Sequence, residues 1–146
     1  MTYVTRGIVP FLVLATTLAC ASPVTGEPLD PEKAFPVTAS LAPGGIDLGF
    51  TILDGYYLYG DRFRVDVDPP GLSLGRTRIP RGEAKDDPFL GKTEILRRQA
   101  FLHLPFTAKA LPGTYALRVT AQGCAEDRVC YAPFTQVVRV TVPAAP

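Results

Sequence analysis

Apolar and polar residues alternate with a period of two along most of this chain, and that period limits the fold more than any other feature. In residues 62–67 (RFRVDV), Phe63, Val65 and Val67 fall on one side and charged residues on the other. Residues 115–121 repeat the pattern. Successive side chains of a strand point to opposite faces of a sheet, so both segments predict strands with one face on a core.

Further segments also predict strands, and turn signals containing Pro or Gly separate them. They are residues 35–41 (edge-like, because Pro36 cannot donate to a ladder), 46–53, 56–59, 94–106 and 135–142, with a short strand or irregular arm over 72–79. A helix over residues 93–102 is an alternative that the neighbouring strands disfavour. Residues 81–92 predict an exposed loop, because they are charged and contain Pro and Gly. Many short strands without a convincing helix predict an all-β fold, an antiparallel β-sandwich.

The N-terminus predicts export. Arg6 precedes an apolar run over residues 8–18 (IVPFLVLATTL). The run is shorter than the roughly 20 residues of a membrane-spanning helix, which favours a signal peptide over residues 1–21.

Two cleavage patterns compete at the end of this leader. Ala19 and Ala21 fit the small-x-small pattern of ordinary signal peptidase. Residues 17–20 (TLAC) instead resemble a lipobox, which ends the leader at residue 19 and makes Cys20 a lipid anchor. Both alternatives predict a periplasmic protein, soluble or lipid-anchored, that touches the membrane only through Cys20.

Beyond the leader, composition predicts one domain. Residues 22–34 are polar and Pro-rich and predict a linker, and residues 35–143 form the predicted sandwich domain. The chain has 15 basic and 14 acidic side chains, and a net charge of +1 does not favour nucleic acid as a partner.

Cys124 and Cys130 are the candidate chemical groups of the mature domain, with five residues between them. Export allows them to form a disulfide. One interpretation is a structural disulfide, although so short a loop gains only roughly 2 to 2.5 kcal/mol from it. The other is a reactive pair, although the spacing is not the C-x-x-C of thioredoxin-like proteins. These residues alone leave both open.

Other kinds of site lack support. His103 is the sole histidine, and with two cysteines it does not make a persuasive zinc set, so we expect no metal and no cofactor. Ser40 and Ser73 lack the G-x-S-x-G context of a hydrolase nucleophile.

Two aromatic features need a partner or a function. Tyr56, Tyr57 and Tyr59 crowd into one short strand, where an aromatic core with hydroxyls at its edge is the simplest interpretation. Phe89 lies at the tip of the polar loop, and a large apolar residue there usually folds back onto the protein or binds something.

Three segments in this order carry a resemblance to a known family. They are residues 54–59 (DGYYLY), residues 87–94 (DPFLGKTE) and residues 122–133 (QGCAEDRVCYAP). Over about residues 35–142, the chain resembles the N-terminal periplasmic domain of the DsbD thiol:disulfide reductases.

The resemblance implies an immunoglobulin-like sandwich with a redox function. Cys130 is then the thiolate that attacks a target disulfide, and Cys124 resolves the mixed disulfide. Phe89 is then the tip of a cap loop that shields the pair, with Asp87 beside it. Tyr57 and Tyr59 line the site.

The resemblance also implies partners. Family members pass electrons from a membrane partner to thioredoxin-fold periplasmic proteins. They usually continue into a membrane domain, whereas this sequence ends at Pro146, so we expect a separate membrane electron donor. Pro88 and Leu90 stand where the family more often has an acidic residue and a tyrosine.

Two alternatives remain beside thiol:disulfide exchange. One is a non-catalytic exported binding domain in which the Cys124–Cys130 disulfide is structural. The other is a lipoprotein of envelope assembly, which depends on lipidation of Cys20.

Overall fold

The protein is almost entirely β-structure in a computed structural model that describes residues 26–144. A single helical turn, α1 (Pro31–Ala34), precedes the strands. The strands are β1 (Val37–Ala42), β2 (Gly45–Thr51), β3 (Tyr56–Tyr59), β4 (Arg64–Asp68), β5 (Glu83–Asp87), β6 (Gly91–Leu96), β7 (Gln99–Pro105), β8 (Gly113–Ala121), β9 (Gly123–Ala125), β10 (Val129–Cys130) and β11 (Phe134–Val142).

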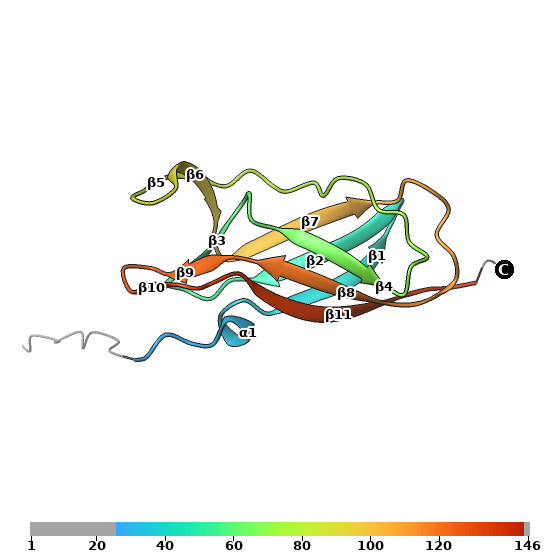
Figure 1. The fold of residues 1–146 in the computed structure, drawn as a ribbon, viewed down its shortest axis with the longest axis horizontal. Helices are drawn as coiled ribbons and strands as arrows, with labels where there is room; N and C mark the ends of the chain where they lie inside the picture. Colours follow the sequence, from blue (N-terminus) through green and yellow to red (C-terminus); the bar gives the residue numbers. More distant parts are fainter. Residues whose placement is uncertain (1–25, 145–146) are drawn as a thin grey trace, which may run out of the picture.

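These strands form three antiparallel sheets. Two of them, β1-β2-β7 and β11-β8-β4, lie face to face as the layers of a sandwich (Figure 1). The third, in the order β10-β9-β3-β6-β5, lies at one end of the sandwich (Figure 1). The predicted all-β antiparallel sandwich is therefore confirmed.

The core lies between the two facing layers, and the period of two decides which residues enter it. Tyr115, Leu117 and Val119 of β8 are 4%, 0% and 1% exposed, while the side chains between them are more accessible. In β2, Ile46 and Leu48 are fully buried in the same way. Phe63, Val65 and Val67 pack against this core as their alternation predicted.

The predicted single strand over residues 94–106 is wrong, because the chain changes sheet in its middle. β6 pairs with β3 and β5, whereas β7 pairs with β2. Arg98 stands at the change with a φ of 64°. That left-handed conformation interrupts an extended strand and redirects the chain.

The predicted loop over residues 81–92 is also wrong, because β5 and β6 form a hairpin there. Asp87 is paired with Gly91 across its tip, and Gly91 has a φ of 73°. The Asp87 carboxylate accepts the N–H groups of Phe89 and Leu90 at 2.9 and 3.0 Å. An Asx-type turn therefore closes a hairpin whose charged strands carry little hydrophobic signal.

The end of the predicted linker is structured and packs against the domain. Residues 31–34 form α1, although no helix was predicted, and Ala34 is fully buried. Ahead of it, the Leu29 N–H donates to Tyr56 Oη at 2.9 Å, and Tyr131 Oη donates to the Leu29 carbonyl at 2.6 Å. Residues 72–79 form the irregular alternative, an arm joined to its neighbours by isolated bridges such as Arg78 to His103.

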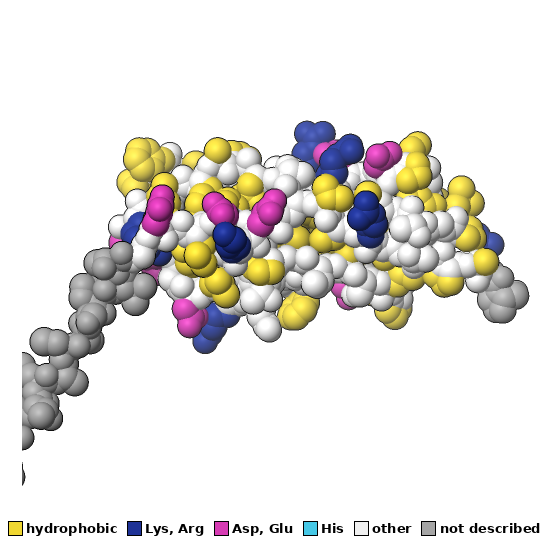
Figure 2. Space-filling view, turned by 90° about the horizontal axis from the view of Figure 1, so that it is seen from below, with side chains coloured by type: hydrophobic (Ala, Val, Ile, Leu, Met, Phe, Trp, Pro, Cys, Tyr) yellow, Lys and Arg dark blue, Asp and Glu magenta, His cyan; other side chains and the backbone are white. Residues whose placement is uncertain are grey.

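The predicted leader over residues 1–21 and the lipobox cysteine Cys20 lie outside the described residues. Among residues 26–144, no helix is long and apolar enough to cross a membrane. Figure 2 shows acidic and basic side chains interspersed on the face drawn, in keeping with the balanced composition.

Candidate redox site

The two cysteines face each other on neighbouring strands at the end of the sandwich. Cys130 of β10 is the register partner of Cys124 of β9, and a disulfide joins them. β9 in turn pairs with β3, where Tyr57 is opposite Cys124. Gly123 precedes the pair, and a β-carbon at this position would collide with the Tyr57 carbonyl oxygen. The glycine is therefore needed for β9 to lie this close to β3.

The two cysteines differ in accessibility. Cys124 is 1% exposed and belongs to a small buried cluster with Tyr57, Tyr59 and Ile95. Cys130 lies on the exposed strand β10 and is itself exposed. A molecule approaching this end of the domain therefore meets Cys130 first.

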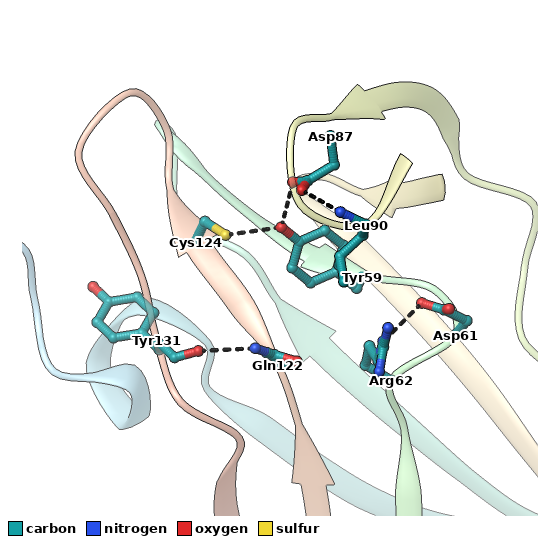
Figure 3. Close-up of polar contacts among 8 residues, drawn as sticks. All are labelled: Tyr59, Asp61, Arg62, Asp87, Leu90, Gln122, Cys124 and Tyr131. Carbon is teal, nitrogen blue, oxygen red and sulfur yellow. Dashed lines mark hydrogen bonds and ion pairs between the residues drawn. The ribbon is translucent and has the colours of Figure 1, made fainter. Parts of the chain in front are cut away.

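Tyr59 lies beneath the disulfide. Its hydroxyl oxygen is 3.3 Å from Cys124 Sγ and 3.8 Å from Cys130 Sγ. Its hydroxyl hydrogen goes to Asp87 Oδ2, at 2.7 Å (Figure 3). The Tyr59 hydrogen is given to Asp87 and sulfurs joined in a disulfide carry none, so this contact becomes a hydrogen bond when the pair is reduced and the Cys124 thiol can donate to the Tyr59 oxygen.

Asp87 joins the cysteine pair to the tip of the β5–β6 hairpin. It is 7% exposed, and its carboxylate receives the Tyr59 hydroxyl as well as two backbone N–H groups of the tip. The hydrogen bond from Tyr59, followed by those from Phe89 and Leu90, lowers the pKa of Asp87. Burial, followed by the bond to Asp87, raises the pKa of Tyr59, which stays protonated at neutral pH.

The expected apolar tip is present, but it does not cover the cysteines in this structure. Phe89 is 92% exposed, and Leu90 beside it is 40% exposed. In this arrangement, Phe89 therefore does not shield the cysteine pair in the way that the resemblance implies. Val129, which precedes Cys130, is also exposed, at 41%.

The ring of Tyr57 contacts both Tyr59 and two cationic side chains. Its ring meets that of Tyr59 edge to face, with centroids 5.5 Å apart. Lys85 Nζ lies 5.2 Å and the Arg97 guanidinium carbon 5.4 Å from the centre of the Tyr57 ring. Such cations over an aromatic face are attracted by its quadrupole.

The structure brings Cys124, Cys130, Tyr57, Tyr59 and Asp87 together, although they come from four strands. Two features were not predicted: the Arg97–Glu126 ion pair, and the hydrogen bonds of Leu29 with Tyr56 and Tyr131. An Arg-Arg pair inside an expected strand was the available signal for the first. Metal-ligating residues do not gather in groups of three within residues 26–144. His103 Nδ1 instead lies 2.6 Å from Asp47 Oδ1.

Fold and site together define the class: an immunoglobulin-like β-sandwich domain with a half-accessible cysteine pair at one end. The family model "Thiol:disulfide interchange protein DsbD, N-terminal" matches residues 25–142. The chain belongs to this family of DsbD N-terminal domains.

Relatives and solved structures agree with this assignment. The chain is 41% identical to DsbD of Neisseria meningitidis serogroup A over 72% of its own length and 17% of that protein's. It is 35% identical to DsbD of Ralstonia nicotianae over 92% of its own length and 22% of that protein's. The chain therefore matches less than a quarter of these relatives.

Two solved structures from Neisseria meningitidis share the fold. One is the DsbD N-terminal domain in the reduced form, at 37% identity and a TM-score of 0.70, over 80% of this chain and 91% of that one. The other is a complex between the DsbD and PilB N-terminal domains, at 37% identity and a TM-score of 0.64, over 77% of this chain and 86% of that one.

We expect the Tyr59→Phe variant to raise the pKa of Asp87 toward its ordinary value, because it removes the main hydrogen bond that favours the carboxylate. A group whose folded pKa is lowered stabilises the fold above its unfolded pKa of about 3.9, and this stability is lost as the pH falls through the folded pKa. Acid should therefore destabilise the wild type in that window, and the variant less steeply. NMR titration of the Asp87 carboxyl measures the shift.

Tyr115→Phe is the matched control for this titration. Tyr115 is also a buried tyrosine, and its hydroxyl donates to the Leu111 carbonyl, away from Asp87. An unchanged Asp87 pKa in Tyr59→Phe would show that the backbone N–H groups of the tip alone hold the carboxylate.

Proposed function

We propose that this domain performs thiol:disulfide exchange in the periplasm, relaying reducing equivalents from a membrane electron donor to thioredoxin-fold partners through Cys124 and Cys130. The observation that carries the proposal is the asymmetry of the pair: an exposed Cys130 is joined to a buried Cys124 at the rim of a domain of the DsbD family. A structural disulfide has no need of that asymmetry.

The reaction follows from the accessibility of the two sulfurs. In the reduced domain, the Cys130 thiolate attacks a sulfur of the target disulfide, forming a mixed disulfide and releasing one target thiolate. The Cys124 thiolate then attacks Cys130 Sγ, forming the intramolecular disulfide and releasing the second target thiolate. The domain is oxidised by two electrons and the target is reduced by two. A membrane donor restores the dithiol by the reverse exchange.

The surroundings of the pair support docking of a protein partner. Exposed apolar side chains lie on two segments of the site: Val129 precedes Cys130, and Phe89 and Leu90 follow Asp87, which accepts the Tyr59 hydroxyl. The related Neisseria domain has been solved in a complex with a PilB N-terminal domain. We assign Phe89 to the cap, with Asp87 anchoring the tip on which it stands. Its exposure here corresponds to an arrangement in which a partner can reach Cys130.

The export signal is part of this proposal. Cleavage after residue 21 gives a soluble periplasmic domain, whereas cleavage after residue 19 gives one anchored through lipidated Cys20. The mass of the mature N-terminus distinguishes the two.

Equilibration with a glutathione redox buffer tests the proposal. We expect the folded protein to equilibrate readily under mild reductant, measured by alkylation of Cys124 and Cys130 and peptide mass, with little change in its free energy of unfolding. A disulfide that resists mild reductant, and whose reduction lowers stability by about 2 kcal/mol, would indicate a non-catalytic binding domain with a structural disulfide.

A further inference from the structure

Arg97 holds the turn between the two cysteines. Arg97 Nη1 donates to Glu126 Oε2 at 2.8 Å, and Nη2 donates to Glu126 Oε1 at 2.5 Å. Glu126 lies between Cys124 and Cys130 on the turn that joins β9 to β10. Two parallel hydrogen bonds between a guanidinium and a carboxylate make a strong and directional pair.

The same arginine contacts two other parts of the site. Its Nε lies 3.4 Å from Glu83 Oε2, on the first residue of β5, and its guanidinium carbon lies 5.4 Å from the centre of the Tyr57 ring. The Arg97 side chain is 24% exposed, less than either carboxylate partner. Arg97 thus contacts three parts of the site: the turn between the two cysteines, the β5–β6 hairpin and the ring of Tyr57.

The Arg97–Glu126 ion pair contributes most to the position of the turn when the disulfide is reduced. Reduction removes the covalent link between β9 and β10, whose ladder joins only two residue pairs. The turn is then held to the domain body by the Glu126 N–H, which donates to the Gly55 carbonyl at 2.8 Å, and by two side-chain contacts. These are the Arg97–Glu126 pair and the Arg128 guanidinium, whose Nη2 donates to Tyr56 Oη at 3.4 Å. Arg128 Nη1 also donates to the Gly26 carbonyl, on the segment before α1. Within residues 26–144, Arg97–Glu126 is the ion pair on this turn.

We propose that Arg97 is a positioning residue for disulfide exchange: through Glu126, it keeps Cys130 opposite Cys124 in the reduced and mixed-disulfide states. The inference rests on the proposed function. Holding two reacting groups in place raises their effective concentration. Cys124 therefore reaches Cys130 Sγ sooner once a target is attached, and closure of the intramolecular disulfide becomes more favourable.

A redox equilibrium separates this role from a general contribution to stability. The equilibrium between dithiol and disulfide compares two folded states, so a substitution that weakens both equally does not move it. A substitution that loosens only the reduced turn disfavours closure of the disulfide. It therefore lowers the equilibrium constant for forming the Cys124–Cys130 disulfide from the dithiol and oxidised glutathione. The mixed disulfide between Cys130 and glutathione then accumulates.

We expect Arg97→Gln to lower this equilibrium constant about fivefold, a factor typical of one lost hydrogen-bonded contact. Glu126→Gln should give a similar decrease, because it weakens the same pair from the other side. Exchanging the charges, as Arg97→Glu with Glu126→Arg, should recover part of the loss. Each variant is equilibrated as the full chain, and the populations of dithiol, mixed disulfide and disulfide are counted by mass.

Two control variants locate the effect. Arg98→Gln changes the next residue in the chain, which is exposed and forms no ion pair within residues 26–144, and it should leave the equilibrium unchanged. Glu83→Gln weakens the contact of Arg97 with the β5–β6 hairpin but leaves the Arg97–Glu126 pair in place. Because Arg97 acts through Glu126, this variant should also leave the equilibrium unchanged.

The outcomes distinguish this inference from the function on which it rests. If the wild type equilibrates and Arg97→Gln and Glu126→Gln behave like it, the positioning role is overturned and the exchange function stands. If the wild-type disulfide does not equilibrate, both are overturned. Near-UV circular dichroism checks folding, and if Arg97→Gln does not fold, Glu126→Gln and the charge-exchanged variant decide the question.

Discussion

The Cys124→Ser variant is expected to trap a thioredoxin-fold protein as a stable mixed disulfide on Cys130. The exposed Cys130 thiolate can still attack the disulfide of the partner, but a serine hydroxyl cannot resolve the product. The adduct, transient in the wild type, should then become the major species. Incubation with an oxidised thioredoxin-fold protein, followed by non-reducing electrophoresis and mass spectrometry of the linked peptides, measures it.

Cys130→Ser is the matched control, because it retains the other cysteine of the pair. Cys124, on the neighbouring strand β9, is 1% exposed, so a partner cannot reach it without opening the site. We therefore expect little or no adduct from this variant. Equal trapping by both variants, or none by Cys124→Ser, would contradict the assignment of Cys130 as the attacking sulfur.

The Phe35→Ala variant is expected to lower the free energy of unfolding by about 3 to 5 kcal/mol, the usual cost of emptying a buried aromatic site. Phe35 is fully buried. Its ring stacks on Phe134 at 5.3 Å and meets Tyr56 and Tyr131 edge to face at 5.8 and 6.0 Å. The truncation therefore removes the contact among the segment after α1, β3, β11 and the residue that follows Cys130.

Phe101→Ala is the control for this prediction. Phe101 is 65% exposed on β7, so the same truncation there should change stability by no more than about 0.5 kcal/mol. Urea unfolding of both variants measures the difference. A loss below about 1 kcal/mol for Phe35→Ala would mean that its neighbours refill the space. Because Tyr131 follows Cys130, we also expect faster alkylation of reduced Cys130 in Phe35→Ala.

The strands of the sandwich could be predicted because each has one face on the core. In β8, burial of every second side chain follows directly from the period of two in the sequence. β5 was not predicted as a strand because three of its five side chains are exposed and most of its residues are charged, so it lacks an apolar alternation. The change of sheet between β6 and β7 was not predicted because both strands are extended. Only the backbone dihedral of Arg98 distinguishes two strands from one.

The candidate site could be predicted in part for a different reason. Tyr57, Tyr59, Asp87 and the two cysteines lie in short segments that carry a family resemblance, and no rule of spacing links them. For the Arg97–Glu126 pair, the signal was two consecutive arginines inside an expected strand, and that signal does not identify a partner 29 positions away.

The sequence by itself therefore determined the β-sandwich, because alternation and local turn chemistry are properties of short segments. It linked the tyrosines to the cysteine pair only through the resemblance to a family. Only the tertiary structure decided which cysteine is exposed, that Tyr59 lies between the sulfurs and Asp87, and that Arg97 holds the turn between the cysteines. These depend on strand pairing between distant segments. β9 is placed on β3 by backbone hydrogen bonds and by a glycine small enough to allow the approach, and this placement buries Cys124.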